Sequence, residues 1–400
     1  MVTTPSLIGE INRPPAEFRN GVRNAFFSDH PIAARKLEHN YGQLMSGSGD
    51  AVRSASDSLS AVLALRDFHF RNLLRISDLY KKSSDPVLVA SQLADLRKTL
   101  AVQAFRLAAS ENPGNYALAI GGSATKGDHT VLTDIDSVVI AAKDEDREAA
   151  LRVQELMVKI LDSTYVESDD VMPFHFACLP VDKLAAKFPL VKKSELTDPF
   201  QRSMWLSNGS FFRFLMDLQV VDSRGKEKTS FYAHRLDEMR EKVNYQNHEA
   251  MLELCGESFA ERTEEKESRG PSHPRPFDIK NEALRPFYYA LYAARARYGI
   301  KTPSPWKAVA ELTGLGILSE KEKEAIELAI RFLLDLRHLI GFSIIHAKDS
   351  KTLSDEAVRA IAYSRGISDE EVVEKAQAAA ATLRAAATKI LTQLRAESSK

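Results

Sequence analysis

The side chains best placed to do chemistry are two carboxylates, Asp134 and Asp136, which lie two residues apart shortly after a turn of small residues. The whole segment, residues 121–136, reads Gly-Gly-Ser-Ala-Thr-Lys-Gly-Asp-His-Thr-Val-Leu-Thr-Asp-Ile-Asp. Mg²⁺ in proteins binds through one or two carboxylates together with substrate phosphates. The spacing therefore predicts a site for a nucleoside triphosphate with its Mg²⁺ ion, or with Mn²⁺ in the same place.

Two apolar runs flank this segment and are expected to position it. Residues 116–120 (Tyr-Ala-Leu-Ala-Ile) predict a buried strand that enters the turn, and Ile135 with residues 137–140 predicts a second strand. Asp134 and Asp136 are expected on that second strand, pointing to one face because side chains alternate along a strand. Glycine lets a ligand approach the backbone closely, so the N–H groups of Gly122 and Ser123 are expected to bind the β- and γ-phosphates, with Lys126 as a neutralising cation.

The segment resembles the signature of the DNA polymerase beta-like nucleotidyltransferases, in which Gly-Ser is followed by Asp-x-Asp. It is most similar to the branch of the protein-PII uridylyltransferases and of related proteins that accompany CBS and cyclic-nucleotide-binding domains. That branch carries Gly-Ser-x-Gly-Arg-Gly-Glu-x-Thr-x-x-Thr-Asp-x-Asp. The matching positions are Gly122, Ser123, Lys126, Gly127, Asp128, Thr130, Thr133, Asp134 and Asp136. Thr125 stands where the branch prefers Gly, and Lys126 stands where it prefers Arg, which forms bidentate phosphate contacts that lysine does not.

The resemblance implies a third carboxylate on the next core strand, and the sequence offers several candidates for it. The third strand is expected at residues 171–179, where His175 takes the central position. Asp217 is the first candidate for a catalytic acid, because residues 215–221, within the apolar segment 211–221, resemble a strand of the family that carries an Asp. Asp169, Asp170 and Asp182 flank the expected third strand. His175 is a candidate base. For Asp217 a structural ion pair or helix cap, and for His175 a hydrogen-bonded place in the core, are equally supported alternatives to these catalytic roles.

The chain as a whole is expected to have an α+β fold. A small mixed sheet with its helices is flanked by N-terminal helices and a C-terminal helical bundle. We expect an N-terminal segment at 1–50, with a Ser-Gly-Ser-Gly linker at 46–49, and a helical region at 51–112. The nucleotidyltransferase domain is expected at 113–256, a charged and proline-rich linker at 257–276, and a helical substrate-binding domain at 277–400.

Three basic residues of the helical domain are candidates for nucleotide binding. Lys280 and Arg285 resemble basic positions in the family's substrate-binding helices, and a solvated surface role is the alternative. Arg337 falls on an apolar helical stripe with Ile330 and Leu333. A guanidinium on such a face needs an anionic partner, which is either a ligand or a structural acid.

Composition excludes several other classes of protein. The net charge of −1 gives no general attraction to nucleic acid or to an anionic membrane. Two cysteines, Cys178 and Cys255, are too few for a disulfide framework, so a reducing compartment is favoured. The first ten residues lack a signal-peptide pattern and no run approaches a membrane span, so a cytoplasmic location is expected, with secretion by a non-cleaved signal left open.

The first functional hypothesis is a Mg²⁺-dependent transfer of a nucleoside monophosphate from a triphosphate to a hydroxyl, with release of pyrophosphate. The acceptor is a protein or a small molecule. The end of a tRNA is disfavoured by the absence of a basic bias, and PII modification is disfavoured because no His-Asp hydrolase pattern follows. The alternative is a nucleotide-binding or partner-binding protein that keeps the fold with weak or no catalysis.

Overall fold

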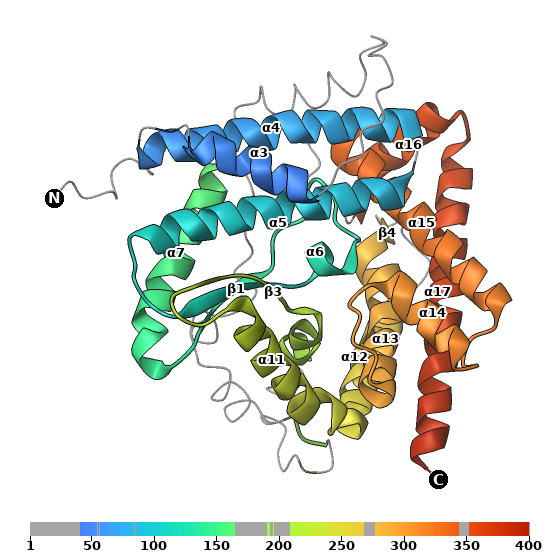
Figure 1. Ribbon diagram of the computed structural model, residues 1–400. Helices are drawn as coiled ribbons and strands as arrows, with labels where there is room; N and C mark the ends of the chain where they lie inside the picture. Colours follow the sequence, from blue (N-terminus) through green and yellow to red (C-terminus); the bar gives the residue numbers. More distant parts are fainter. Residues whose placement is uncertain are drawn as a thin grey trace. The chain divides into compact units, whose positions relative to one another are not determined.

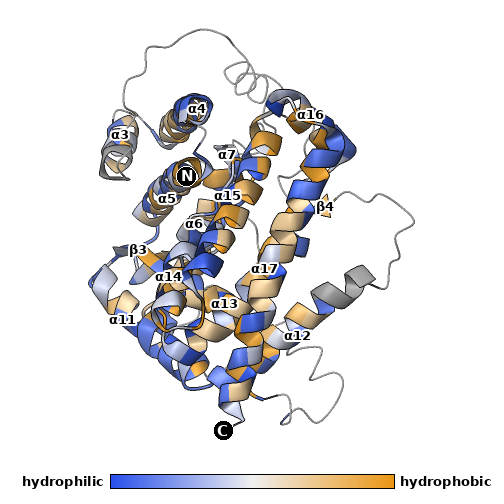
Figure 2. Ribbon diagram, turned by 90° about the vertical axis from the view of Figure 1, so that its right-hand side faces the viewer, coloured by the Kyte–Doolittle hydropathy of each residue, from blue (hydrophilic) through white to orange (hydrophobic). Residues whose placement is uncertain are grey.

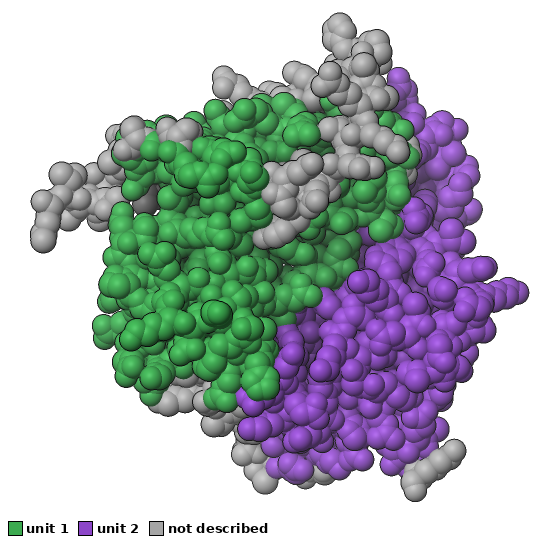
Figure 3. Space-filling model, in the orientation of Figure 1, with its two compact units in different colours: residues 1–184, 218–235, 341–348 green, residues 185–217, 236–340, 349–400 purple. Residues whose placement is uncertain are grey.

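The computed structural model describes residues 41–53, 55, 57–83, 85–164, 190–192, 195, 209–267, 277–343 and 352–399 (Figure 1). The expected strand at 171–179, with His175, Asp169, Asp170 and Asp182, lies outside these residues. The chain forms two compact units, coloured separately in Figure 3. The first contains residues 1–184, 218–235 and 341–348, and the second contains 185–217, 236–340 and 349–400. Each unit is thus assembled from separate stretches of sequence.

Three helices of the first unit, all N-terminal to its sheet, pack on one another: α3 (Tyr41–Arg53), α4 (Ser58–Ser83) and α5 (Pro86–Ser110) (Figure 1). The two long helices confirm the prediction, and α5 begins at an Asp85 cap that accepts from the Val87 and Leu88 amides. The expected linker at 46–49 is wrong, because these residues belong to α3. Ser48 is fully buried and accepts a hydrogen bond from Gln103 of α5, 3.0 Å away. Small side chains here permit close helix packing, which outweighs their low helix propensity.

The sheet of the first unit has the strand order β2-β1-β3 among the described residues. β1 (Tyr116–Ile120) and β2 (Ser137–Ala141) confirm the two expected strands, and β3 (Gln219–Arg224) pairs on the other side of β1, both pairings being antiparallel. All five residues of β1 are buried. A bulge in the β1–β3 pairing lies between the partners of Leu118 and Ala119. β1 is therefore the central strand, and the turn after it emerges from the middle of this sheet.

Helix α7 (Arg147–Ser163) and α5 pack together and against the sheet, and α7 follows the short 3₁₀ turn η1 (Asp144–Asp146). The Gln154 side chain accepts a hydrogen bond from the Val139 amide of β2, 2.8 Å away. At the opposite end from the turn, Asn115 donates its amide to Asp146 and accepts from Lys226. These contacts join the start of β1 to α7 and to the end of β3.

Two expectations for the middle of the chain are wrong. Residues 209–217 form a helix, so the strand expected at 215–221 begins only at Gln219, as β3. A short apolar run is ambiguous between helix and strand, and here Arg240 and Asn244 donate to the carbonyls of Leu215 and Phe212. The expected linker at 257–276 is also helical as far as Glu267, within α12 (His248–Glu267). Its Glu, Lys and Arg residues are good helix formers, and Cys255 and Ser258 anchor it by burial.

The second unit is built mainly from helices, as expected. They comprise α12, α13 (Arg285–Tyr298), α14 (Pro305–Gly314), most of α15 (Glu320–Ser343), α16 (Asp355–Arg365) and α17 (Asp369–Ser398). Two short strands, β4 (Phe277–Asp278) and β5 (Thr352–Leu353), pair with each other. Every residue of α13 from Pro286 to Ala296 is buried, whereas α17 has an apolar face opposite a polar one (Figure 2). α13 thus forms the centre of this unit and α17 covers it.

Serine residues cap the starts of α15 and α17, and at α15 a glutamate completes a capping box. Ser319 and Glu322 exchange hydrogen bonds, with the Ser319 amide 2.8 Å from a Glu322 carboxylate oxygen. Ser368 accepts from the Glu371 amide at 3.1 Å. Across the described residues, no helix is both long enough and apolar enough to span a bilayer.

Candidate functional site

The connection between β1 and β2 carries the predicted site. After β1 the backbone turns sharply at Gly122 (φ 59°, ψ −140°), runs through the four-residue helix α6 (Ser123–Lys126) and turns again at Gly127 (φ 78°). Gly127 donates its amide to the Ser123 carbonyl at 3.1 Å, which closes this helical turn. Both glycines have positive φ, a region that side-chain-bearing residues rarely adopt.

Gly122 also lies directly against one of the predicted carboxylates. A Cβ atom added at Gly122 would lie 1.7 Å from Asp136 Oδ2. The Gly121 amide donates to the Asp136 carbonyl at 2.9 Å, which extends the β1–β2 pairing beyond the strands. The glycine turn and the carboxylate thus form one structural unit, and glycine is required at position 122 by both backbone angle and space.

Substituting Gly122 by alanine should therefore lower both the stability of the fold and the binding of nucleotide. Backbone strain at such angles costs about 1–3 kcal/mol, and the new methyl group would displace the Asp136 carboxylate. We expect lower stability to denaturant together with loss of Mg²⁺-dependent nucleotide binding, measured by urea unfolding and by calorimetric titration.

Gly127→Ala is the matched control. It also has positive φ, but no atom lies within 4 Å of its added Cβ. We expect it to cost about 1 kcal/mol from backbone strain and to retain nucleotide binding. Equal binding by both alanine variants would contradict the proposed role of the Gly122–Asp136 contact.

Asp134 and Asp136 lie just before β2, so their expected position on the strand itself is wrong by one to three residues. The strand begins only at Ser137 because β1 ends at Ile120 and, after the Gly121–Asp136 hydrogen bond, the backbone turns away at Gly122. The side chains still alternate, since Ile135 is fully buried between two partly exposed carboxylates. Among the described residues, Asp134 forms no hydrogen bond or ion pair. The two carboxylates thus share the side of the segment away from the core.

A buried polar turn precedes the carboxylates, and the sequence alone gave its residues no role. The Thr130 and Thr133 hydroxyls are 2.7 Å apart, and the Thr133 amide donates to the Thr130 carbonyl at 3.1 Å. Asp128 and His129 beside them are also buried. The Thr-x-x-Thr spacing was the available signal, because threonine hydroxyls commonly bond nearby backbone in turns. The turn fixes the approach of the chain to Asp134.

Within the described part of the chain, the Gly122 and Ser123 groups predicted to bind phosphate are not used as hydrogen-bond donors. Neither the Gly122 nor the Ser123 amide donates a hydrogen bond to a described residue, nor does the Ser123 hydroxyl. Lys126 is partly exposed at the end of α6. Thr125, which departs from the family pattern, fits by donating its hydroxyl to the Gly122 carbonyl at 3.0 Å. The departure at Thr125 therefore leaves the turn intact.

Asp217 is located differently from the prediction. It ends the helical segment 209–217 in the second unit and is 1% exposed. Arg295 donates to its Oδ1 at 2.7 Å, and the Tyr292 hydroxyl donates to its Oδ2. These contacts favour the structural ion pair that the sequence also allowed, and a catalytic role for Asp217 stays a prediction.

Asp222 is a carboxylate of the first unit that lies on β3. It pairs with Leu118, which also pairs with Val139, so all three side chains share one face of the sheet. Asp136 follows the opposite alternation, because Ser137 shares the Val139 face. Asp222 is also bonded to Arg106 of α5, 2.7 Å away. Its position thus gives it no place beside Asp136.

The remaining nucleotide-binding candidates all belong to the second unit. Lys280 lies in the π-helical turn η4 (Ile279–Leu284), which Asp278 caps by accepting from the Asn281 amide. Arg285 is the first residue of α13, and both basic side chains are partly exposed. Arg337 on α15 is 1% exposed, which confirms its burial. The contact of these three with a nucleotide stays a prediction.

The donor set at the carboxylate pair fits a hard divalent cation. No group of three or more His, Cys, Asp or Glu ligands occurs among the described residues. Mg²⁺ does not require one, since it retains waters and shares substrate phosphates. Asp134 and Asp136, both partly exposed, with Asp136 held over Gly122, supply the two carboxylates that such a site uses.

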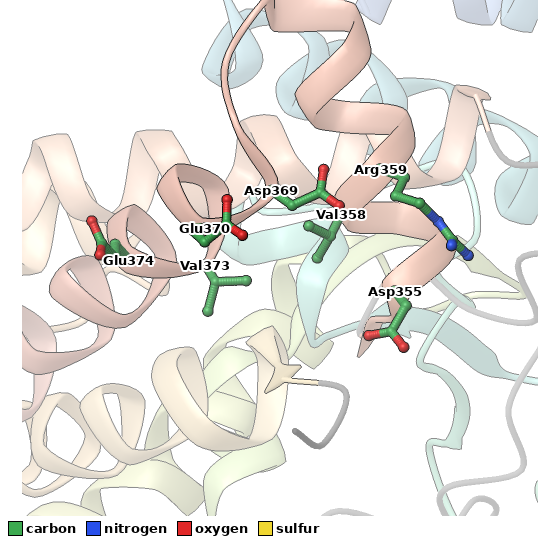
Figure 4. A pocket seen from close by; sticks show the side chains of 7 residues that line it. All are labelled: Asp355, Val358, Arg359, Asp369, Glu370, Val373 and Glu374. Atoms are coloured by element: carbon green, nitrogen blue, oxygen red, sulfur yellow. The ribbon is translucent and has the colours of Figure 1, made fainter. Parts of the chain in front are cut away.

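The second unit also contains an acidic surface hollow of about 510 Å³ between α16 and α17 (Figure 4). Its polar lining comprises Asp355, Arg359, Asp369, Glu370 and Glu374. Three of these acids lie in the first turns of their helices. Carboxylates stabilise the positive end of a helix dipole, which accounts for their presence without a ligand.

Comparison with known families finds a match to part of the chain. Residues 73–169 match the model of a family described as "Putative nucleotidyltransferase DUF294". The matched stretch runs from the middle of α4 through α5, β1, α6, β2 and α7, and so contains the whole 121–136 segment. It supports a relationship to a nucleotidyltransferase family and does not distinguish the uridylyltransferase branch. No curated protein matches the chain.

Proposed function

We propose that the chain is a Mg²⁺-dependent nucleotidyltransferase that moves a nucleoside monophosphate from a triphosphate to a hydroxyl of a protein or small molecule. The contact of Asp136 with Gly122 carries this proposal. It joins a glycine turn, suited to phosphates, to a carboxylate pair suited to a divalent cation, and it lies inside the stretch that matches a nucleotidyltransferase family.

In this proposal the residues of the connection have separate roles. Asp134 and Asp136 hold the cation, which supplies charge stabilisation to the oxygens that enter and leave phosphorus. The Gly122 and Ser123 amides and the Ser123 hydroxyl bind the β- and γ-phosphates. Lys126 adds a positive charge as a point donor without the bidentate geometry of arginine. Together they orient the triphosphate so that its α-phosphorus faces the acceptor.

The reaction forms one bond and breaks one. The acceptor hydroxyl oxygen bonds to the α-phosphorus, the bond from that phosphorus to the bridging oxygen breaks, and pyrophosphate leaves. The hydroxyl proton passes to a base or to solvent. His175 and the acids near residues 171–179 remain predictions for that base, since they lie outside the described residues.

The direct test incubates the full chain with Mg²⁺ and each of the four labelled triphosphates in turn. We expect pyrophosphate release with at least one of them, and transfer of label to an acceptor from small-molecule and protein fractions. Mn²⁺ should replace Mg²⁺, and EDTA should stop the reaction.

The same assay tests the competing hypothesis of a catalytically weak or inactive binding protein. Tight Mg²⁺-dependent nucleotide binding with no pyrophosphate release in the presence of any acceptor would overturn the enzyme hypothesis and support that alternative. Absence of both binding and release would overturn both.

A further inference from the structure

A buried chain of polar contacts ties the turn before Asp134 to the helices of the first unit. Arg97 of α5 is 3% exposed, and its Nη2 donates to the Val131 carbonyl at 2.8 Å. Val131 is the second residue of the Thr130–Thr133 turn and also packs against Gly341, where an added Cβ would lie 2.6 Å from Val131 Cγ1. Arg97 thus bonds the turn at Val131, three residues before Asp134.

His69 of α4 continues this chain of contacts. It is fully buried, and its Nε2 lies 2.8 Å from Arg97 Nη1. Arginine is always a donor, so Nε2 must accept and cannot carry a proton. The proton is therefore on Nδ1, which donates to the Thr164 carbonyl at the end of α7, 2.8 Å away. The geometry requires a neutral imidazole in one tautomer.

The surroundings of His69 favour the same neutral form. Burial, and then the charge of Arg97, lower the pKa of His69 well below its ordinary value, against a smaller opposing effect of the Thr164 hydrogen bond. From α7 the contact is the uncharged Thr164 carbonyl. On α3, Asp50 and Arg53 pair with each other at the surface. The hydrogen-bond partners described for the imidazole are the Thr164 carbonyl and the Arg97 guanidinium, and Arg97 is the charged one.

We propose that His69 and Arg97 are positioning residues, which hold the Thr130–Thr133 turn and through it set the place of Asp134. This inference rests on the proposed function for its catalytic consequence. Its structural content concerns only residues of the first unit. A neutral His69 links α4, α5 and α7 to the turn by donating from Nδ1 to Thr164 and accepting at Nε2 from Arg97, and protonation would remove the acceptor contact.

Hydrogen exchange of the amides in residues 127–136 tests the structural content without any substrate. Arg97→Met removes the donor to the Val131 carbonyl and to His69 Nε2, so exchange at residues 127–136 should accelerate by about tenfold or more. Arg106→Met is the control on the same helix, where the side chain is 54% exposed, and should leave these amides unchanged. Unchanged exchange in a folded Arg97→Met protein would overturn the proposal.

The wild-type protein provides a second test if Arg97→Met fails to fold. The unfolded chain takes up the His69 proton near its ordinary pKa of about 6.5, whereas the folded chain does so only at lower pH. This contribution to stability is therefore complete above about pH 6.5 and falls below it, by up to about tenfold in the unfolding constant per pH unit. Exchange at 127–136, corrected for its intrinsic pH dependence, should accelerate over that range.

His69→Gln keeps an acceptor for Arg97 and does not titrate, so it should remove most of this pH dependence while retaining slow exchange at pH 7. A pH profile identical in wild type and His69→Gln would overturn the role of the imidazole.

Kinetics then separate this inference from the proposed function. If the wild type turns over nucleotide, Arg97→Met should raise the Mg²⁺ concentration for half-maximal rate several-fold and lower kcat, with a smaller change in KM for the triphosphate. A merely destabilised protein would lose active fraction with no change in the Mg²⁺ requirement, which would count against positioning. A wild type without turnover would overturn the proposed function, and the exchange results would still decide the structural content.

Discussion

Asp136→Asn is expected to lower the rate of pyrophosphate release by about a thousandfold, because the charge stabilisation that a bound metal gives the transition state is worth several kcal/mol. Asparagine keeps the size of the side chain, so the contact with Gly122 remains and the fold should be preserved. Initial rates at saturating triphosphate, measured across a range of Mg²⁺ concentrations, check this result. Excess Mg²⁺ should not restore the rate, because the lost ligand carried the charge.

Asp222→Asn is the control for that substitution. Asp222 lies on β3 of the same unit, on the opposite face of the sheet, and forms an ion pair with the largely exposed Arg106. Such pairs contribute at most about 1 kcal/mol, so we expect a rate within about threefold of wild type. Full activity in Asp136→Asn, with a fully active control, would show that this carboxylate does not hold the metal.

The second large effect concerns the buried pair of Asp217 and Arg295. Both side chains are at most 3% exposed, and Arg295 also donates to the Met216 carbonyl at 2.7 Å. Asp217→Leu would leave a guanidinium buried without its anion, which costs about 3–5 kcal/mol. Urea unfolding of the variant should show this loss as a lower midpoint with an unchanged slope.

A double variant and a surface control sharpen that prediction. Asp217→Leu with Arg295→Met removes both charges and should recover most of the lost stability, because buried pairs are often replaceable by apolar groups. Asp237→Asn breaks the 2.6 Å pair with Arg240, in which Asp237 is 49% exposed, and should cost no more than about 1 kcal/mol. Turnover of the double variant decides the role of Asp217: loss of turnover in a stable protein would establish the catalytic role.

The parts of the fold that were predictable from sequence are those with a strong local pattern. The apolar run at 116–120, the capping serines Ser319 and Ser368, and the long helical stripes each determine their own structure. The predictions were wrong where tertiary contacts determine the secondary structure. Ser48 is helical because Gln103 and neighbouring side chains pack around it, and residues 209–217 are helical because Arg240 and Asn244 bond their carbonyls.

The candidate site follows the same division. Gly122 and the carboxylates were visible as a motif with a physical rationale, and the structure adds the contact that joins them. Arg97 and His69 carried no sequence signal, because a lone histidine and a lone arginine on amphipathic helices are usually ordinary residues. The network is revealed only by the fold, which buries both side chains and brings two residues 28 positions apart into hydrogen-bond contact.

The placement of β3 has a consequence for synthesis of the chain. Leu118 pairs with Asp222, and these residues are separated by more than a hundred positions. At ribosomal rates of about 5–20 residues per second, β1 emerges about 5–20 s before its β3 partner. During that interval β1, whose residues are all buried in the folded protein, has β2 on one edge and lacks its β3 partner on the other. The nascent protein is therefore expected to depend on chaperones or on early docking of α5 and α7 to avoid edge-to-edge association.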